Sequence, residues 1–209
     1  MTTAKNAGLA TYGRPADTEY FSVALASDVT SIPTSATDEL EECFEWVKIS
    51  SDGLTEKPDL GKGDPLKDWT GKSQIDSPSN PSAQLTAPIL SQTRAGLQLF
   101  YGADNVEADE TTGKPTSWGF DGSTDEYVIV TDELWNDENG KPADLVRTVY
   151  PRAVPQELGD VSHTREDGIV REVTFDLLAG EDGRYYNSYR ASSASKARSK
   201  AKAAKAAKQ

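Results

Sequence analysis

The sequence predicts a mainly β protein: a β-sandwich or barrel with one flanking α-helix, a long loop and an arm at each end. Three observations lead to this prediction. Short segments of alternating apolar and polar residues recur, only one segment has a clear helical stripe, and the 209 residues include 16 Gly and 11 Pro, which favour turns over long helices. We expect an N-terminal arm over residues 1–18, a body over 19–180 and a C-terminal extension over 181–209.

The expected strands are segments whose side chains alternate between two faces. They cover residues 19–25, 83–90, 126–131, 144–150 and 168–178. Pro88 indicates a sheet edge or a strand end, because proline donates no hydrogen bond to a neighbouring strand. Tyr127 and Ile129 share one face of their strand, and Val128 and Val130 share the other. Asn139–Gly140 is typical of a two-residue turn and predicts a hairpin between two of these strands.

The last strand, residues 168–178, has the most regular alternation. One face carries Ile169, Arg171, Val173, Phe175 and Leu177, and the opposite face carries Val170, Glu172, Thr174 and Asp176. The first face suits a hydrophobic core and the second suits water. Glu172 and Asp176 are therefore expected to face solvent.

The clearest helix is expected from Gln92 to Tyr101. Ser91 has a side chain suited to cap its first turn, and Gly102 is suited to end it. Its apolar stripe consists of Leu97, Phe100 and Tyr101.

The segment before residue 50 supports two interpretations. Helical spacing is present at Leu40, Cys43, Phe44 and Val47. Asp38 and Glu41 have the spacing of a capping box for such a helix. Residues 44–50, however, are rich in aromatic and β-branched residues, which favour a strand. We favour a helical turn that leads into a strand, with Cys43 as a buried structural cysteine.

Two segments are expected to be loops. Residues 57–82 contain four prolines and three glycines, and residues 103–124 are mostly polar. Each contains one tryptophan, Trp69 and Trp118, and large aromatic residues dominate the binding energy of protein interfaces. We therefore predict Trp69 and Trp118 as interface anchors, and we expect residues 57–82 to become ordered on assembly.

The charge is unevenly distributed. The whole chain carries 22 basic and 34 acidic residues, but the stretch from Arg190 to Gln209 contains seven basic residues and no acid. Residues 1–189 therefore hold 15 basic and 34 acidic residues, a formal charge of −19. Such a body repels a nucleic-acid backbone. The Lys/Ala-rich tail has the composition of a DNA-binding or membrane-surface arm, but a solvated, frayed end is the favoured interpretation.

No catalytic centre is predicted. Cys43 and His163 are the only residues of their types, so an intrachain disulfide, a multi-cysteine zinc site and a multi-histidine site are excluded. Residues 70–73 resemble the end of a phosphate-binding loop, but Leu66 stands where the motif needs glycine. The acids between 121 and 126 do not have the spacing of a calcium loop. No run of 18 apolar residues or signal-peptide pattern is present, so we expect no membrane insertion.

Several motifs, taken in order, point to a family. They are residues 46–54 (WVKISSDGL), Asp68–Trp69, a strand over 83–90 leading to a helix that ends in Phe100–Tyr101–Gly102, Gly159–Asp160–Val161, and residues 166–175 (EDGIVREVTF). This order resembles the major tail tube proteins of bacteriophages with long, non-contractile tails, especially those of actinobacterial hosts. The resemblance covers roughly residues 1 to 180.

The resemblance implies a structural role without catalytic residues or cofactors. It implies a β-sandwich or barrel that forms hexameric rings, and rings that stack into a hollow tube around a tape-measure protein. Tail terminator and distal tail proteins are the other implied partners, and DNA later passes through the lumen. The protein would be made in the host cytoplasm and incorporated in the virion. Glu172 and Asp176 are our candidates for lumen-facing acids.

Three other functions remain open. A β-sandwich binding module, such as a virion decoration protein, would recognise a glycan through Trp69 and Trp118. A tail terminator or other head–tail connector would form rings that do not stack into long tubes. A hydrolase with a carboxylate pair would lose activity on a single Asp or Glu substitution, but no distinctive pair is visible.

Overall fold

The structure is a computed structural model. It describes residues 13–15, 20–61, 66–67, 69–70, 72–75, 80–109, 111–136, 142–161 and 168–192. The Asn139–Gly140 turn, His163 and the basic tail beyond residue 192 lie outside the described residues, as does most of the N-terminal arm.

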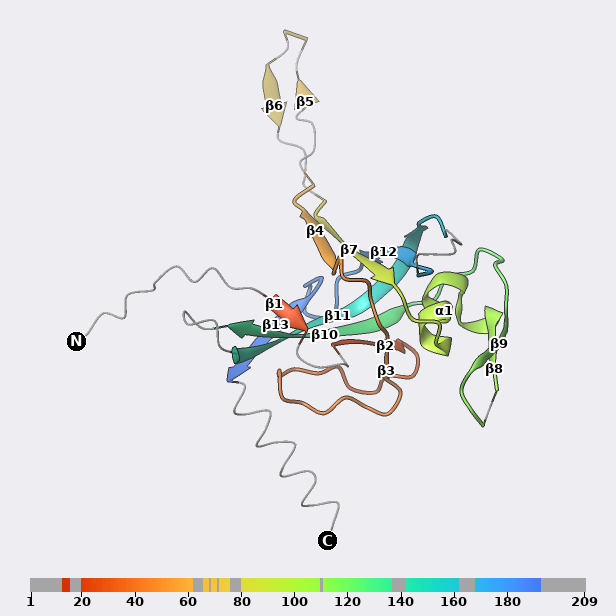
Figure 1. Ribbon diagram of the computed structural model, residues 1–209. Helices are drawn as coiled ribbons and strands as arrows, with labels where there is room; N and C mark the ends of the chain where they lie inside the picture. Colours follow the sequence, from red (N-terminus) through yellow and green to blue (C-terminus); the bar gives the residue numbers. More distant parts are fainter. Residues whose placement is uncertain are drawn as a thin grey trace, which may run out of the picture.

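Nine of the described strands belong to one antiparallel sheet (Figure 1). Its strands are β1 (Gly13–Pro15), β2 (Phe21–Leu25), β3 (Glu45–Trp46), β4 (Thr55–Asp59), β7 (Ser82–Ile89), β10 (Tyr127–Asn136), β11 (Pro142–Leu158), β12 (Arg171–Leu177) and β13 (Asn187–Ser192). The order is β3-β2-β10-β11-β12-β7-β4, with β1 also paired to β10 and β13 to β11. The prediction of a mainly β protein is confirmed. β10 and β11 pair as the expected hairpin.

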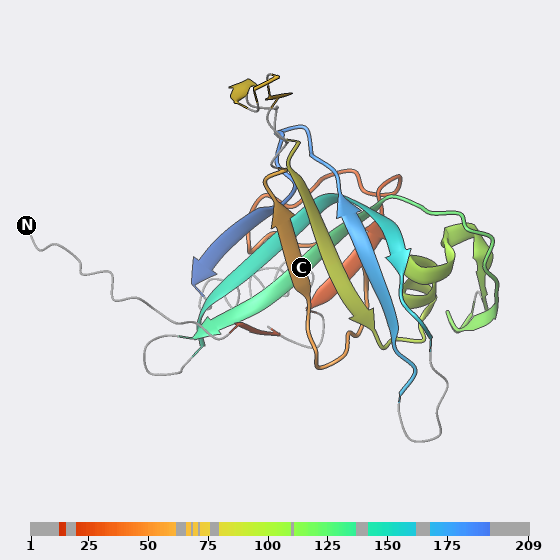
Figure 2. The same ribbon diagram turned by 90° about the horizontal axis from the view of Figure 1, so that it is seen from above.

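The chain from β3 to β4 closes this sheet into a barrel (Figure 2). β3 pairs with β2, and the Val47 amide then donates to the Phe21 carbonyl at 2.8 Å. The next residues cross to the end of β7, where the Ser50 amide donates to the Pro88 carbonyl at 2.7 Å. β4 then pairs with the first part of β7. The segment 45–59 therefore connects the two ends of the sheet with backbone hydrogen bonds.

The hydrophobic core fills the barrel. Its largest fully buried side chains include Phe21, Leu85, Ile129, Tyr150 and Phe175. The predicted alternation in β10 is confirmed, because Tyr127 and Ile129 face this core while Val128 and Val130 face outward. The outward valines are covered by side chains of the segment 26–44.

The only α-helix among the described residues, α1 (Arg94–Tyr101), packs Ala95 and Leu99 against one end of the core. It ends at Gly102 as predicted, but its N-cap is Thr93 and not Ser91. The Ser91 hydroxyl instead accepts a hydrogen bond from the Lys48 amide at 2.9 Å. That contact holds the segment that closes the barrel, so the serine is not available to the helix. No described helix has the length and apolar character needed to cross a membrane.

Residues 40–47 form the favoured turn followed by a strand, and not a continuous helix. One hydrogen-bonded turn, from the Phe44 amide to the Glu41 carbonyl, precedes the two-residue strand β3. Phe44 packs on the outward valines of β10, whereas Val47 faces the barrel interior, so the four apolar residues do not share one face. Cys43 is half-buried, not buried as expected, and burial together with Glu41 raises the pKa of its thiol.

The segments expected to be loops or arms contain paired strands. Residues 57–82 include the end of β4 and a hairpin of β5 (Leu66–Lys67) and β6 (Ser73–Ile75). Residues 103–124 include a 3-10 turn, η1 (Ala103–Asn105), and a hairpin of β8 (Val106–Ala108) and β9 (Pro115–Trp118). Trp118 thus lies in a strand. β1 and β13 come from the two expected arms.

Candidate interaction surfaces

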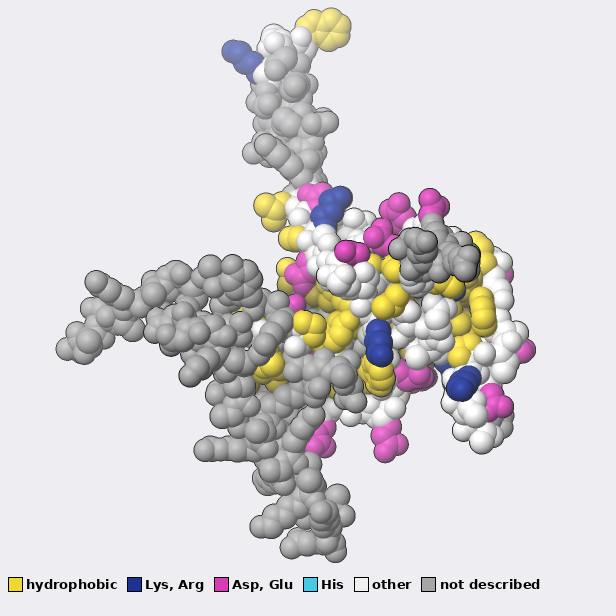
Figure 3. Space-filling model, viewed as in Figure 1, with side chains coloured by type: hydrophobic (Ala, Val, Ile, Leu, Met, Phe, Trp, Pro, Cys, Tyr) yellow, Lys and Arg dark blue, Asp and Glu magenta, His cyan; other side chains and the backbone are white. Residues whose placement is uncertain are grey.

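The hairpin of β5 and β6 projects from the barrel, and we call it the tip hairpin (Figure 1). Trp69 lies between its two strands and is fully exposed, at 104%. The chain reaches the hairpin past Gly61, which has a φ of 61° and faces Asn80 on the returning chain. A Cβ at Gly61 would lie 1.9 Å from the Asn80 carbonyl oxygen, so only glycine permits this close approach. A hydrophobic side chain is visible at the end of the projection in Figure 3.

A second surface is the outer face of β4, β7, β12 and the end of β11, which we call the polar face. Its outward residues are Thr55, Lys57, Asp59, Ser82, Gln84, Thr86, Pro88, Val154, Glu157, Glu172, Thr174 and Asp176. Ten of these twelve are polar or charged, with four acids and one lysine. Acidic side chains are also spread over the side of the molecule shown in Figure 3.

The predicted acids Glu172 and Asp176 both lie on this polar face. Glu172 is exposed, while Asp176 is half-buried and accepts a hydrogen bond from the Gln84 side-chain amide at 2.9 Å. The hydroxyls of Thr86 and Thr174 pair across the same two strands at 3.0 Å. The outward orientation expected from alternation is confirmed for both acids.

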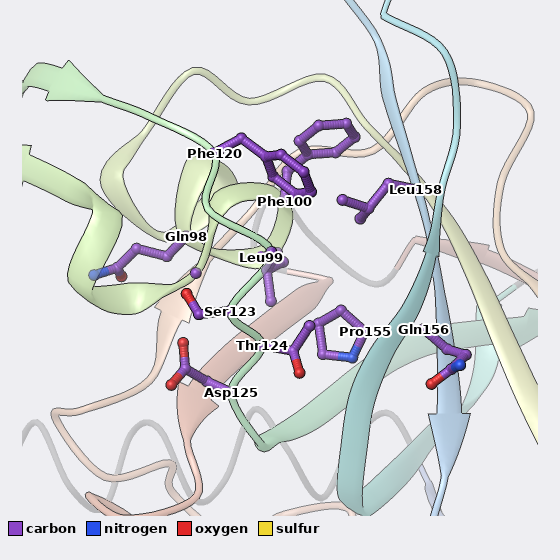
Figure 4. Close-up of a pocket in the computed structure, with 12 residues that line it drawn as sticks. Gln98, Leu99, Phe100, Phe120, Ser123, Thr124, Asp125, Pro155, Gln156 and Leu158 are labelled. Carbon is purple, nitrogen blue, oxygen red and sulfur yellow. The ribbon is translucent and has the colours of Figure 1, made fainter.

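A third feature is a pocket of about 300 Å³ beside α1, which we call the α1 pocket (Figure 4). Its walls come from α1, from the segment 120–125 and from the end of β11. Figure 4 shows Phe100, Phe120 and Leu158 gathered at one end, and Ser123 and Asp125 at the other. Phe120 is 64% exposed, so the apolar end is open to solvent.

Hydrogen bonds fix the segment 120–125 against α1. The Ala103 amide donates to Asp125 Oδ2 at 2.7 Å, and the Asn105 side chain donates to Asp121 at 2.6 Å and to Ser123 at 3.0 Å. Hydrogen bonds from Ser123 and Asn105 hold the pKa of Asp121 below its ordinary value. These acids therefore stabilise the turn that presents Phe120. Within the described residues, no cluster of three or more His, Cys, Asp or Glu side chains is placed to hold a metal ion.

Sequence reasoning missed the α1 pocket. Phe120 lies in the segment expected to be a polar loop, and the sequence signal is the Trp–Gly–Phe cluster at 118–120. The two predicted anchors are placed apart, because Trp69 lies on the tip hairpin and Trp118 lies on β9 beside α1 (Figure 1). Trp118 is 47% exposed. They do not form one binding surface within a single chain.

The buried arginines Arg147 and Arg171 are held by hydrogen bonds, although Nε of Arg171 has no hydrogen-bond partner among the described residues. Arg147 forms a two-pronged ion pair with Asp132, with N···O distances of 2.7 and 2.8 Å, and donates to the Asp38 carbonyl at 2.6 Å. Buried Arg171 donates to the Gln92 side chain at 2.9 Å.

Comparison with protein-family models and with curated proteins finds nothing that matches the chain.

Proposed function

We propose that this chain is a structural subunit of the tail tube of a long, non-contractile-tailed bacteriophage. The tip hairpin carries the proposal. A two-stranded hairpin is marginal on its own, and this one projects from the barrel with a fully exposed tryptophan. A large apolar side chain held away from its own domain is characteristic of a contact with another molecule. In a self-assembling protein, that molecule is another copy of the chain.

The polar face supports the same function. Tail DNA must slide through a tube without binding to its wall, and a wall with four acids and one lysine repels phosphates. The proposal places Glu172 and Asp176 at the lumen. The tape-measure protein occupies this lumen before DNA does.

The sheet edges supply the lateral contacts in this proposal. Every residue of β4 is exposed, and among the described strands β4 pairs only with β7 and β13 only with β11. Each edge presents backbone groups that a strand of a neighbouring subunit can pair with. Lateral pairing closes a ring, which we propose is hexameric, and the rings stack. Tail terminator and distal tail proteins bind the ends of the tube, which is incorporated in the virion after assembly in the host cytoplasm.

Negative-stain electron microscopy of the purified, concentrated protein tests this proposal. Hollow tubes of stacked rings are expected. Single rings that never stack indicate a terminator or connector, and persistent monomers or small closed oligomers indicate a binding module; either result contradicts the tail tube function.

The lumen assignment has its own test. Glu172→Lys is expected to leave tube formation intact but to make tubes retain added double-stranded DNA at low salt. The matched control is Glu39→Lys, because Glu39 is also exposed but lies in the segment 26–44, away from the polar face. Equal DNA retention by both variants contradicts the placement of Glu172 at the lumen.

A further inference from the structure

Two features of the chain have apolar surface that their own chain does not cover. Trp69 on the tip hairpin is fully exposed, and Phe120 leaves the α1 pocket open at its apolar end. They cannot meet within one molecule, because the tip hairpin and α1 lie at separate extremes of the barrel in both views (Figures 1 and 2).

We propose that Trp69 of one copy inserts into the α1 pocket of a second copy. This inference rests on the proposed function and names the contact by which its subunits join. A volume of about 300 Å³ is at the small end of the range for ligand pockets, so it suits one side chain better than a larger ligand.

The chemistry of the pocket matches an indole ring. Phe100 and Phe120 offer aromatic faces and edges, with Leu158 beside them, and such ring pairs are favourable in tilted and offset arrangements. A buried tryptophan also needs an acceptor for its Nε1–H. At the polar end of the pocket, Asp125 uses Oδ2 for the Ala103 amide and has a second carboxylate oxygen for the indole.

The charges on the two surfaces are complementary. Asp104, Asp121 and Asp125 lie on or beside the turn that forms the pocket, and two of them are exposed. Residues 62–72 hold three lysines and two aspartates, a net positive segment within a strongly acidic body. Lys72, next to the tip, is exposed. Opposite charge favours the encounter of these two surfaces over that of two pockets or two hairpins.

The proposed contact joins two different patches, so it is heterologous. After the first contact, one copy still has an empty α1 pocket and the other still has a free tip hairpin. Further copies can therefore join at both ends through the same contact. This property is required for open-ended growth. The proposal therefore connects one side chain, Trp69, to polymerisation.

Disulfide trapping between two variants tests the contact. Both carry Cys43→Ser, which removes the only native cysteine. One also carries Thr70→Cys, beside the inserted tryptophan, and the other carries Gln156→Cys, an exposed residue of the pocket wall. Equimolar mixtures are oxidised with copper phenanthroline, and the mixed dimer is measured on non-reducing gels. We expect rapid formation of this dimer.

The matched variants decide the result. Adding Trp69→Ala to the first chain is expected to slow trapping about thirty-fold or more, the effect of removing a central interface tryptophan. Trp46→Ala in the first chain is the control and should leave the rate unchanged, because Trp46 is also exposed but lies on β3. Phe120→Asp in the second chain should slow trapping as Trp69→Ala does. A rate unaffected by Trp69→Ala, or no faster than that of a distant pair such as Thr70→Cys with Glu39→Cys, would overturn the proposal.

The outcome is separable from that of the proposed function. Tubes in the electron microscope without specific trapping leave the tail tube function standing and remove this contact. Specific trapping without tubes keeps the contact and removes the tail tube function. A pocket that binds a glycan or another protein instead of Trp69 gives neither trapping nor any effect of Trp69→Ala.

Discussion

The ion pair between Arg147 and Asp132 gives the sharpest prediction about stability. The two residues are direct neighbours across β10 and β11, and their side chains are only 5% and 8% exposed. Asp132→Asn keeps the shape of the side chain but leaves the guanidinium buried without its counter-charge. Breaking a buried pair in this way costs about 3 to 5 kcal/mol, a large share of the roughly 5 to 15 kcal/mol that stabilises a typical domain.

The assay is urea unfolding followed by tryptophan fluorescence, with the protein dilute enough to remain monomeric. Asp144→Asn is the matched control, because its partner Arg190 is 57% exposed, and the expected cost is below about 1 kcal/mol. Replacing both Arg147 and Asp132 by leucine should cost much less than Asp132→Asn alone, since no charge then remains buried. A loss for Asp132→Asn no larger than for Asp144→Asn would refute the reasoning.

Three further predictions concern the backbone and pH. In urea unfolding, Gly61→Ala should destabilise the protein more than Gly53→Ala. Both glycines have a positive φ, which costs alanine about 1 kcal/mol, but of the two only Gly61 lies against the backbone of another segment. Equal losses of stability would argue against this close approach. A hydrogen bond from Arg152 lowers the pKa of Glu126, so the contribution of Glu126 to the free energy of unfolding is present above about pH 4.5 and is lost as the pH falls toward the folded-state pKa. With Glu126→Gln, the free energy of unfolding should therefore fall less steeply as the pH is lowered. Burial raises the pKa of Tyr127 and Tyr150, so their contribution to the stability of the fold is present below about pH 10 and is lost as the pH rises further. Absorbance at 295 nm should show that two of the eight tyrosines ionise only when the protein unfolds. Ionisation of all eight in the folded protein at pH 11 would contradict this.

The strands that face a core on one side were predicted well, because their alternation records burial directly. β12 and the first part of β10 show this, since every predicted inward residue of β12 is buried. β4 was missed because its residues (TEKPD) are all exposed, and its position depends on pairing with β7 rather than on local preference. Ser91 and Thr93 are both suitable caps locally, and only the hydrogen bond from the Lys48 amide to Ser91 decides between them.

The candidate surfaces were predicted in part. Glu172 and Asp176 were correctly assigned to an outward face, and their position at a lumen stays a proposal, because alternation does not distinguish a lumen from outer solvent. The exposure of Trp69 agrees with its prediction as an interface anchor, which remains to be tested. The α1 pocket joins residues near positions 100, 122 and 157, so tertiary packing creates it and no single segment carries its signal.

The most direct test of the central claim is immuno-electron microscopy of phage particles that contain this chain. Antibodies raised against the purified protein are expected to label the tail shaft along its full length at regular intervals. Label confined to the head, the neck or the tail tip, or particles whose tail tubes lack the chain, would contradict the tail tube function.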